Sequence, residues 1–307
     1  MKQEPVIIGT RDSELALWQA RLVQEGLQRH GIESILAPLK SEGDIDLVTP
    51  LYAMGVQGVF TRALDAALLA GRIDIAVHSM KDVPTQLAQG IRQAAVLSRG
   101  NHRDILVPKK ETGFLNDEDY AAIIATSSIR RKAQWLHRYP QHRLVNLRGN
   151  VNTRLRKLQE ENWDAAIFAA AGLERIGLRP ESAINLDWML PSPAQGAIMV
   201  VCRQNDATSF EKLHLLNHAE TALCTKTERD FLNTLMGGCS TPISALAQVE
   251  NGRLHFQGAI HATDGAAALH TEKTATNDEM EHTGMLAAKE LLDKGAGELV
   301  TKSRNHG

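Results

Sequence analysis

The chain has 307 residues, enough for two or three domains rather than one. Hydrophobic residues make up 43% and charged residues 23%, an ordinary globular composition that excludes wholesale disorder. The net charge is -2, so bulk charge does not make the protein a binder of polyanions. The longest apolar run, 165–171, is too short to cross a bilayer, and residues 1–5 begin no secretory leader, so we expect no membrane partner.

Strand-like and helix-like segments alternate over the first 200 residues. Helices are predicted from Ser13 onward, over 60–69, after Ser128, around Arg154 and after Ala171. Short buried strands are predicted at 6–9, 73–77, 121–125, 143–147, 164–169 and 197–202. Such alternation indicates parallel α/β units whose functional groups gather where the strands end.

After residue 217 the pattern changes. A helix over 218–235 leads to the break Met236-Gly237-Gly238-Cys239, and three strand-like runs follow. The dipeptides Asn251-Gly252 and Asp264-Gly265 between those runs are strong hairpin signals, so an antiparallel meander is predicted. A closing helix is predicted at 279–294. This part of the chain is interpreted as a small α+β domain.

Basic residues are concentrated in one window, 126–160. It holds nine Lys and Arg residues against one acid, Glu160, and carries +8 while the rest of the chain carries -10. A basic island in an acidic protein points to an anionic ligand held in one place. A solvated helix face with a few salt bridges would carry the same charges, and both interpretations stay open here.

Two predicted strands end in turns built from the same residue types. Segments 9–13 (Gly-Thr-Arg-Asp-Ser) and 125–131 (Ala-Thr-Ser-Ser-Ile-Arg-Arg) both place hydroxyls and arginines at a helix start. Backbone N–H groups, the helix dipole and hydroxyls bind anions there, and arginine pairs with carboxylates or phosphates. One such turn is usually only a helix cap. Two of them, with Arg148 and Arg154 at a third strand end, favour a site for several anionic groups.

Phosphate and nucleic acid fit the sequence less well than carboxylates do. No Gly-rich phosphate loop follows any predicted strand, which argues against a nucleotide site. The basic window contains only Trp135 and Tyr139 as aromatic residues, which argues against a nucleic-acid partner.

The segment 78–84 (His-Ser-Met-Lys-Asp-Val-Pro) directly follows the predicted strand 73–77. The plain interpretation of Lys81 and Asp82 is a surface turn before Pro84. The functional one is a carboxylate facing a cationic intermediate, which at about 4 Å and an effective dielectric constant near 20 contributes roughly 4 kcal/mol. If that energy is realised only in the transition state, it amounts to about a thousandfold in rate. Asp82 is therefore a candidate catalytic residue.

The three cysteines differ in their surroundings. Cys202 ends an apolar run and Cys224 lies within a predicted helix, so both are interpreted as packed residues. Cys239 follows two glycines on a loop that can approach a cleft, which leaves both a reactive and an inert role open. Their spacing fits neither a metal site nor a disulfide framework, which indicates a reducing cytoplasm.

Together these segments closely resemble the hydroxymethylbilane synthase family, also called porphobilinogen deaminases. The resemblance spans nearly the whole chain and rests on segments 9–20, 74–84, 125–131, 146–151 and 237–239. The runs His-Ser-Met-Lys-Asp-Val-Pro and Ser-Ser-Ile-Arg-Arg are highly specific in combination.

The resemblance implies a transferase of heme and porphyrin biosynthesis. Such an enzyme joins four porphobilinogen molecules head to tail into linear hydroxymethylbilane and loses ammonia at each addition. The chain would grow on a dipyrromethane cofactor attached through a thioether to Cys239, without a metal, and Asp82 would stabilise the cation left when ammonia departs. The residues implied to bind the carboxylates of cofactor and substrate are Arg11, Ser13, Lys81, Thr126, Ser128, Arg130, Arg131, Arg148, Arg154, Arg175 and Gln195.

The fold implied by the resemblance is α/β, with two periplasmic-binding-protein-like lobes and a smaller C-terminal α+β domain. The lobe with Asp82 would comprise 1–98 and 197–216, the lobe with the arginine island 102–192, and the domain with Cys239 217–307. Crossings near 97–103 and 192–196 would serve as hinges beside a cleft that the strand ends face. We expect a cytoplasmic monomer.

The sequence departs from the family at two positions. Gln57 stands where relatives commonly carry lysine, which weakens any charged contact there. Ala194 stands in Ala-Gln-Gly where Gly-Gln-Gly is usual, which we expect to stiffen one hinge slightly.

Two other functions remain as alternatives. A non-catalytic anion-binding relative of solute-binding proteins would explain the lobes and the arginines but leaves Asp82 and Cys239 unused. A nucleic-acid binder would explain only the basic window.

Overall fold

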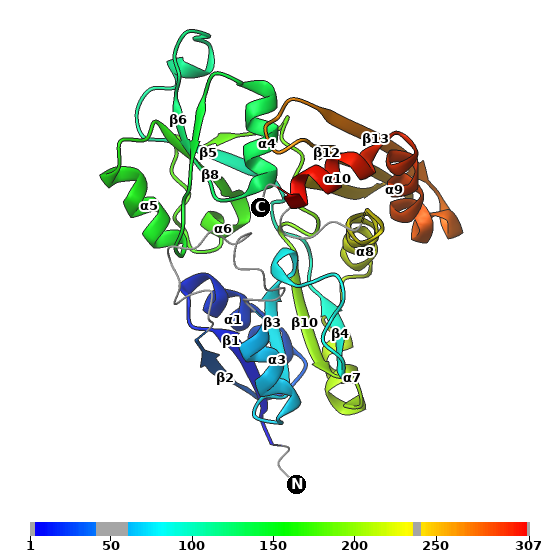
Figure 1. Ribbon diagram of the computed structural model, residues 1–307. Helices are drawn as coiled ribbons and strands as arrows, with labels where there is room; N and C mark the ends of the chain where they lie inside the picture. Colours follow the sequence, from blue (N-terminus) through cyan, green and yellow to red (C-terminus); the bar gives the residue numbers. More distant parts are fainter. Residues whose placement is uncertain (1–3, 41–60, 236–240, 306–307) are drawn as a thin grey trace. The chain divides into compact units, whose positions relative to one another are not determined.

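The computed structural model describes residues 4–40, 61–235 and 241–305 (Figure 1). The chain forms two compact units, and within the described ranges it passes between them at residues 100–101, 195–196 and 222–223. The first two of these points fall within the predicted crossings 97–103 and 192–196. None of the helices in the described parts is sufficiently long and apolar to span a bilayer.

The first unit is built on a five-stranded sheet. Its strand order is β2 (Ser34–Leu39), β1 (Val6–Arg11), β3 (Ile75–Ser79), β10 (Ile198–Arg203) and β4 (Ile91–Val96). The first three strands are parallel, whereas β10 runs antiparallel to both of its neighbours. Apolar side chains of the sheet pack with those of α1 (Glu14–Arg29) and α7 (Ala207–His214). A further helix, α3 (Arg62–Leu69), precedes β3.

A second five-stranded sheet lies in the second unit. Its strand order is β7 (Arg143–Val145), β6 (Ile123–Ala125), β8 (Ala165–Ala169), β5 (Asp104–Pro108) and β9 (Ile184–Asn185). Strands β6, β7 and β8 are parallel, and β5 is antiparallel to β8 and β9. The helices α4 (Ile129–Arg138), α5 (Val151–Glu160) and α6 (Ala170–Glu174) follow the parallel strands.

The second unit also contains a three-stranded antiparallel sheet. It comprises β11 (Ile243–Glu250), β12 (Arg253–His261) and β13 (Ala268–Ala275). One face packs against the helices α8 (Ala219–Thr234), α9 (Thr283–Asp293) and α10 (Ala296–Asn305). A Cβ atom on Gly258 would approach the Phe231 ring to 2.6 Å, so this packing requires glycine at that position.

The predicted fold class is confirmed: two α/β sheets and a smaller α+β part. Both hairpins are also confirmed, because Glu250 pairs with Arg253 and His261 with Ala268 across the two turns. The division of the second unit into a lobe (102–192) and a C-terminal domain (217–307) stays a prediction.

Two details of the prediction were wrong. The large sheets are mixed rather than wholly parallel, because β10 and β5 run against their neighbours. The closing helix is a 3-10 turn (Asn277–His282) followed by α9, and an unpredicted helix, α10, comes after it. Gly295, with a φ of 95°, separates the two helices, since a left-handed residue cannot continue α9.

Candidate active site

The catalytic candidate of the first unit lies at the carboxyl end of β3. A single 3-10 turn, η2 (Met80–Asp82), follows this strand. The buried Met80 anchors the turn, since its N–H donates to Ala197 O (3.0 Å) and its carbonyl accepts from Val83 N (3.1 Å). Asp82 is exposed at the end of this fixed turn, and Lys81 is half-buried beside it. A carboxylate is therefore presented to solvent on a turn that two backbone hydrogen bonds hold.

Two side chains before Asp82 are held from neighbouring elements. Ser79 Oγ lies 2.8 Å from Gln19 Nε2 and 3.2 Å from Gln19 Oε1, so α1 is tied directly to the end of β3. Burial, and after it the charge of Arg11, lowers the pKa of His78 to about 4. His78 is therefore a neutral, buried side chain next to the strand end.

The predicted anion turn of the first unit follows β1. Arg11 is the last residue of that strand, and Ser13 caps α1, its Oγ accepting from Ala16 N at 3.4 Å. Thr10 is fully buried and donates to Ala16 O at 3.0 Å. Because β1 and β3 are parallel neighbours, Arg11 and the turn with Asp82 lie at the same edge of the sheet. The Ser13 contact is the ordinary helix cap that the plain interpretation foresaw.

In the second unit, two predicted turns lie side by side because β6 and β7 are parallel neighbours. Leu147 N donates to Ser127 Oγ at 2.8 Å, which links the turn after β6 to the turn after β7. Ser128 caps α4 by accepting from Arg131 N (3.4 Å), and buried Thr126 accepts from Ser128 N (3.3 Å). The hydroxyls and the positive end of α4 are thus gathered at one sheet edge.

A buried carboxylate organises the arginine pair at the start of α4. Asp104, the first residue of β5, lies 2.7 Å from Arg130 Nη2 through Oδ2. Its Oδ1 lies 2.9 Å from Arg131 Nε and 2.8 Å from Nη2. Arg131 also donates to Ile167 O (3.0 Å), and Arg130 donates to Leu190 O (2.8 Å). One negative charge thus serves two arginines, which leaves an excess positive charge.

Gln195 belongs to the same cluster. Its Nε2 donates to Asp104 Oδ1 (2.9 Å) and to His102 O (2.8 Å). The preceding residue, Ala194, is fully buried and has a φ of 61°, a left-handed conformation that costs an alanine about 1–2 kcal/mol. Position 194, where this sequence has alanine in place of the usual glycine, is therefore a strained residue.

The remaining predicted arginines lie before, within or after the helices that follow β7 and β8. Arg148 is buried just before α5, and Arg154 Nε donates to Gly149 O (2.8 Å) in the same turn. Arg175 follows α6, and burial lowers its pKa to about 10, with Glu174 opposing the shift.

The cysteine predictions divide in two. Cys202 and Cys224 are buried and form no disulfide among the described residues, and their burial was expected. Cys239 and Gln57 lie outside the described residues, and their predicted roles stay predictions.

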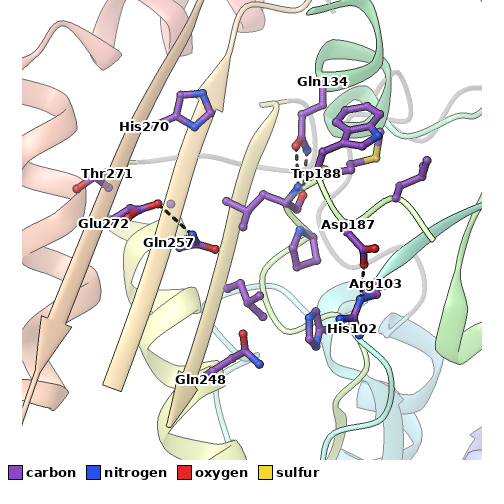
Figure 2. A pocket seen from close by; sticks show the side chains of 16 residues that line it. His102, Arg103, Gln134, Asp187, Trp188, Gln248, Gln257, His270, Thr271 and Glu272 are labelled. Atoms are coloured by element: carbon purple, nitrogen blue, oxygen red, sulfur yellow. Dashed lines mark hydrogen bonds and ion pairs between the residues drawn. The ribbon is translucent and has the colours of Figure 1, made fainter. Parts of the chain in front are cut away.

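A separate pocket of about 410 Å³ lies against the open face of the small sheet (Figure 2). Trp188 and the Arg103–Asp187 ion pair (2.7 Å) line one side, and Gln257 and Glu272 on β12 and β13 line another. None of the predicted site residues that the structure describes lines it.

Sequence reasoning missed Asp104, the residue that joins Arg130 to Arg131. The sequence shows only an acid before the apolar run 105–107, and that pattern does not predict burial, because Asp74 and Asp164 precede similar runs and are partly exposed. Gln134 was missed as well: it donates to Leu190 O, accepts from Leu190 N and donates to Ser244 Oγ, each at 2.9 Å. No sequence pattern marks that contact between α4 and β11.

Comparison with known proteins adds to this geometry. Residues 6–211 match the family model "Porphobilinogen deaminase, dipyromethane cofactor binding domain", and 222–293 match "Porphobilinogen deaminase, C-terminal domain". A porphobilinogen deaminase of Chloroherpeton thalassium is 39% identical, covering 98% of both chains. One of Pelotomaculum thermopropionicum is 41% identical, covering 99% of this chain and 98% of the relative.

Solved structures with a likeness to the chain include a periplasmic domain and a substrate-binding domain. A VFT2 domain of Bordetella pertussis BvgS has a TM-score of 0.43 at 13% identity, covering 69% of this chain and 86% of its own. A substrate-binding domain of a putative amino acid ABC transporter from Streptococcus pneumoniae has a TM-score of 0.45 at 10% identity, covering 69% and 90%.

The fold defines an α/β protein in which arginines gather near the ends of strands. The matches along nearly the whole chain then define its family: the chain belongs to the porphobilinogen deaminases.

Proposed function

We propose that Asp82 is the catalytic carboxylate of this porphobilinogen deaminase and that its strand-end arginines bind the acidic side chains of cofactor and substrate. The family activity is that of hydroxymethylbilane synthase, a transferase that condenses four porphobilinogen molecules with loss of ammonia. The observation that carries the assignment is the family match over almost the full length, with Asp82 and the arginines at strand ends.

The donors in the second unit fit a ligand with several carboxylates. Arg130 Nε is buried and makes no hydrogen bond among the described residues, and Asp104 offsets only one of two arginine charges. A further carboxylate, supplied by the ligand, would accept a hydrogen bond from Arg130 Nε and would offset the second arginine charge. When bound, the dipyrromethane supplies the pyrrole to which incoming units are added. The residues that would hold its carboxylates and those of the substrate added to it are Arg130, Arg131, Arg148, Arg154, Thr126 and Ser128, with Arg175 and Gln195 beside them.

Asp82 acts on the positive charge that develops as ammonia leaves the substrate. A carboxylate about 4 Å from that charge stabilises it by roughly 4 kcal/mol at an effective dielectric constant near 20. The backbone hydrogen bonds of Met80 hold the turn that carries the carboxylate, which reduces the reorganisation needed during reaction. The same carboxylate can accept the proton that the pyrrole carbon loses when its ring regains aromaticity. Arg11, Ser13 and Lys81 would bind substrate carboxylates at the same sheet edge.

We further propose that Cys239 carries the cofactor through a thioether and that the protein works as a cytoplasmic monomer. Cys202 and Cys224 form no disulfide among the described residues, which is compatible with a reducing compartment. Light scattering of the purified protein tests the monomer, and a doubled mass would contradict it.

The deciding experiment is the intact mass of the purified, denatured protein, followed by peptide mapping. We expect an added mass of two linked pyrroles on the peptide that contains Cys239. Protein of unmodified mass is then incubated with porphobilinogen, because an apoenzyme acquires the adduct. Protein that gains no adduct and consumes no porphobilinogen would contradict the proposal. An adduct on another peptide, or on a Cys239→Ser variant, would move the attachment elsewhere.

A further inference from the structure

Ala194 is a strained residue at a point where the chain passes between units. Among the described residues other than glycine, only Ala194 and Asn251 have a positive φ, at 61° and 51°. Asn251 lies in an exposed hairpin turn, where asparagine tolerates this conformation. Ala194 is instead fully buried and immediately precedes Gln195. Something in its surroundings must hold it there, because an unrestrained alanine avoids this region.

Glu228 supplies the restraint. This residue of α8 is 0% exposed, and its Oε2 accepts a hydrogen bond from Ala194 N at 2.6 Å. Its Oε1 accepts from Ala247 N on β11 at 2.7 Å. Both are short, buried bonds to a carboxylate, which belong to the strong class of hydrogen bonds. The same loop is tied to β11 again, since Ala245 N donates to Pro191 O (3.1 Å).

Gln195, which follows Ala194, connects this restrained backbone to the arginine pair. Gln195 Nε2 contacts Asp104 Oδ1, and the two oxygens of Asp104 contact Arg131 and Arg130. The direction of the Gln195 side chain depends on the backbone angles at Ala194 and Gln195. A change at Ala194 therefore alters the hydrogen bonding of the carboxylate that orients both arginines.

We propose that Glu228 is a positioning residue: by holding Ala194 in the left-handed conformation it keeps Gln195 on Asp104, and thereby keeps Arg130 and Arg131 oriented for an anionic ligand. Glu228 does not touch the ligand in this proposal. The expected effect on catalysis rests on the proposed function, in which the two arginines bind the ligand. The restraint of Ala194 by Glu228 is independent of that function.

The decisive comparison pairs Glu228→Gln with Ala194→Gly. A glutamine at position 228 has one acceptor oxygen, so it can accept from Ala194 N or from Ala247 N but not from both. Its NH2 group would face the other N–H donor. Ala194 would then leave the left-handed region, but a glycine occupies that region without help. The Glu228→Gln substitution should therefore raise KM when residue 194 is alanine and change KM little when residue 194 is glycine.

The experiment measures steady-state kinetics with porphobilinogen for the wild-type holoenzyme, both single variants and the double variant. We expect Glu228→Gln to raise KM about tenfold with kcat within about twofold, because the arginines bind their ligand alike before and during reaction. Ala194→Gly should stay within about twofold of wild type. The double variant should recover KM to within about threefold of wild type.

Two matched variants separate this effect from general ones. Asn251→Gly introduces a glycine at the other left-handed residue, and its combination with Glu228→Gln should restore nothing. Asp206→Asn removes another carboxylate that accepts a backbone N–H, that of Ser209 at 2.9 Å in the first unit. It should lower the unfolding midpoint and leave KM unchanged. If Glu228→Gln does not accumulate as folded protein, Glu228→Asp, which cannot reach both donors, replaces it in the same series.

A hydrogen-exchange measurement, which needs no turnover, tests whether Glu228 restrains the backbone at Ala194. Hydrogen exchange of the peptide spanning 193–196 should quicken at least tenfold in Glu228→Gln and stay at the wild-type rate in Asp206→Asn. Unchanged exchange, or a KM defect equally large with Gly at 194, would overturn the proposal. Faster exchange with a wild-type KM would overturn the link to the arginines. A wild-type protein that does not consume porphobilinogen would contradict the proposed function, and the exchange result would still decide the restraint.

Discussion

Asp104 and Arg130 form an ion pair that is almost completely removed from water. The carboxylate is 0% exposed and the arginine side chain 6%, with Nη2 and Oδ2 2.7 Å apart. Such a pair offers little net stability over apolar residues of similar size, but removal of one partner is costly. Together with Arg131, it fixes two guanidinium groups at the start of α4.

Replacement of Asp104 by asparagine should destabilise the protein by about 3–5 kcal/mol, because two buried arginines lose their counter-charge. Denaturant unfolding measures the loss. Asp187→Asn is the matched control, since the Asp187 carboxylate pairs with Arg103 while 69% exposed and should change stability by less than about 1 kcal/mol. Equal stability of the two variants would contradict the role given to Asp104.

Substitution of Asp82 by asparagine should lower kcat about a thousandfold, the rate equivalent of roughly 4 kcal/mol. The unfolding midpoint and the cofactor mass should remain those of wild type, because the side chain is exposed. Glu211→Gln removes another exposed acid of the first unit and should leave turnover unchanged. Near-normal turnover of the Asp82 variant would refute its catalytic role.

Arg148→Leu should impair cofactor loading or raise KM ten- to a hundredfold, the equivalent of the roughly 1.5–3 kcal/mol lost with one charge-assisted bond. Arg156→Leu is the control from the same basic window, because that side chain is 66% exposed and pairs with Glu160. Intact mass and kinetics measure both effects. Normal loading and KM in both variants would contradict the anion-site interpretation.

Acid should weaken the packing between α4 and the small sheet. Burial, followed by the charges of His270, His137 and Arg130, lowers the pKa of His261 to about 3. Its unfolded pKa is about 6.5, so the unfolded chain binds the proton first as the pH falls. The unfolding free energy should drop by about 1.4 kcal/mol per pH unit between pH 6.5 and 3 from this group.

A His261→Phe variant should flatten that dependence and leave stability near pH 8 almost unchanged, since no hydrogen bond reaches His261 Nδ1 among the described residues. Exposed His255 provides the control, and its phenylalanine variant should keep the wild-type slope. Denaturant titrations at several pH values make the comparison. Identical slopes for all three proteins would count against a buried neutral His261.

Local patterns predicted much of this structure because they act over a few residues. Ser13 and Ser128 cap their helices as expected, and Asn251-Gly252 forms its hairpin turn, since each depends on its immediate neighbours. The basic island was also visible. Its partner Asp104 was not, because the bonds to Arg130 and Arg131 join residues 26 and 27 positions apart. Glu228 and Ala194 are separated still further, and only the folded chain brings them together.

The position of β10 between β3 and β4 has a consequence for synthesis of the protein. On a ribosome, β3 and β4 emerge about a hundred residues before the strand that pairs with both. Until residues 198–203 have left the exit tunnel, those two strands lack their shared partner and expose hydrogen-bonding edges. The first unit therefore completes its sheet only after residues 101–195 have been made, and an isolated fragment ending near residue 100 lacks the strand that joins β3 to β4.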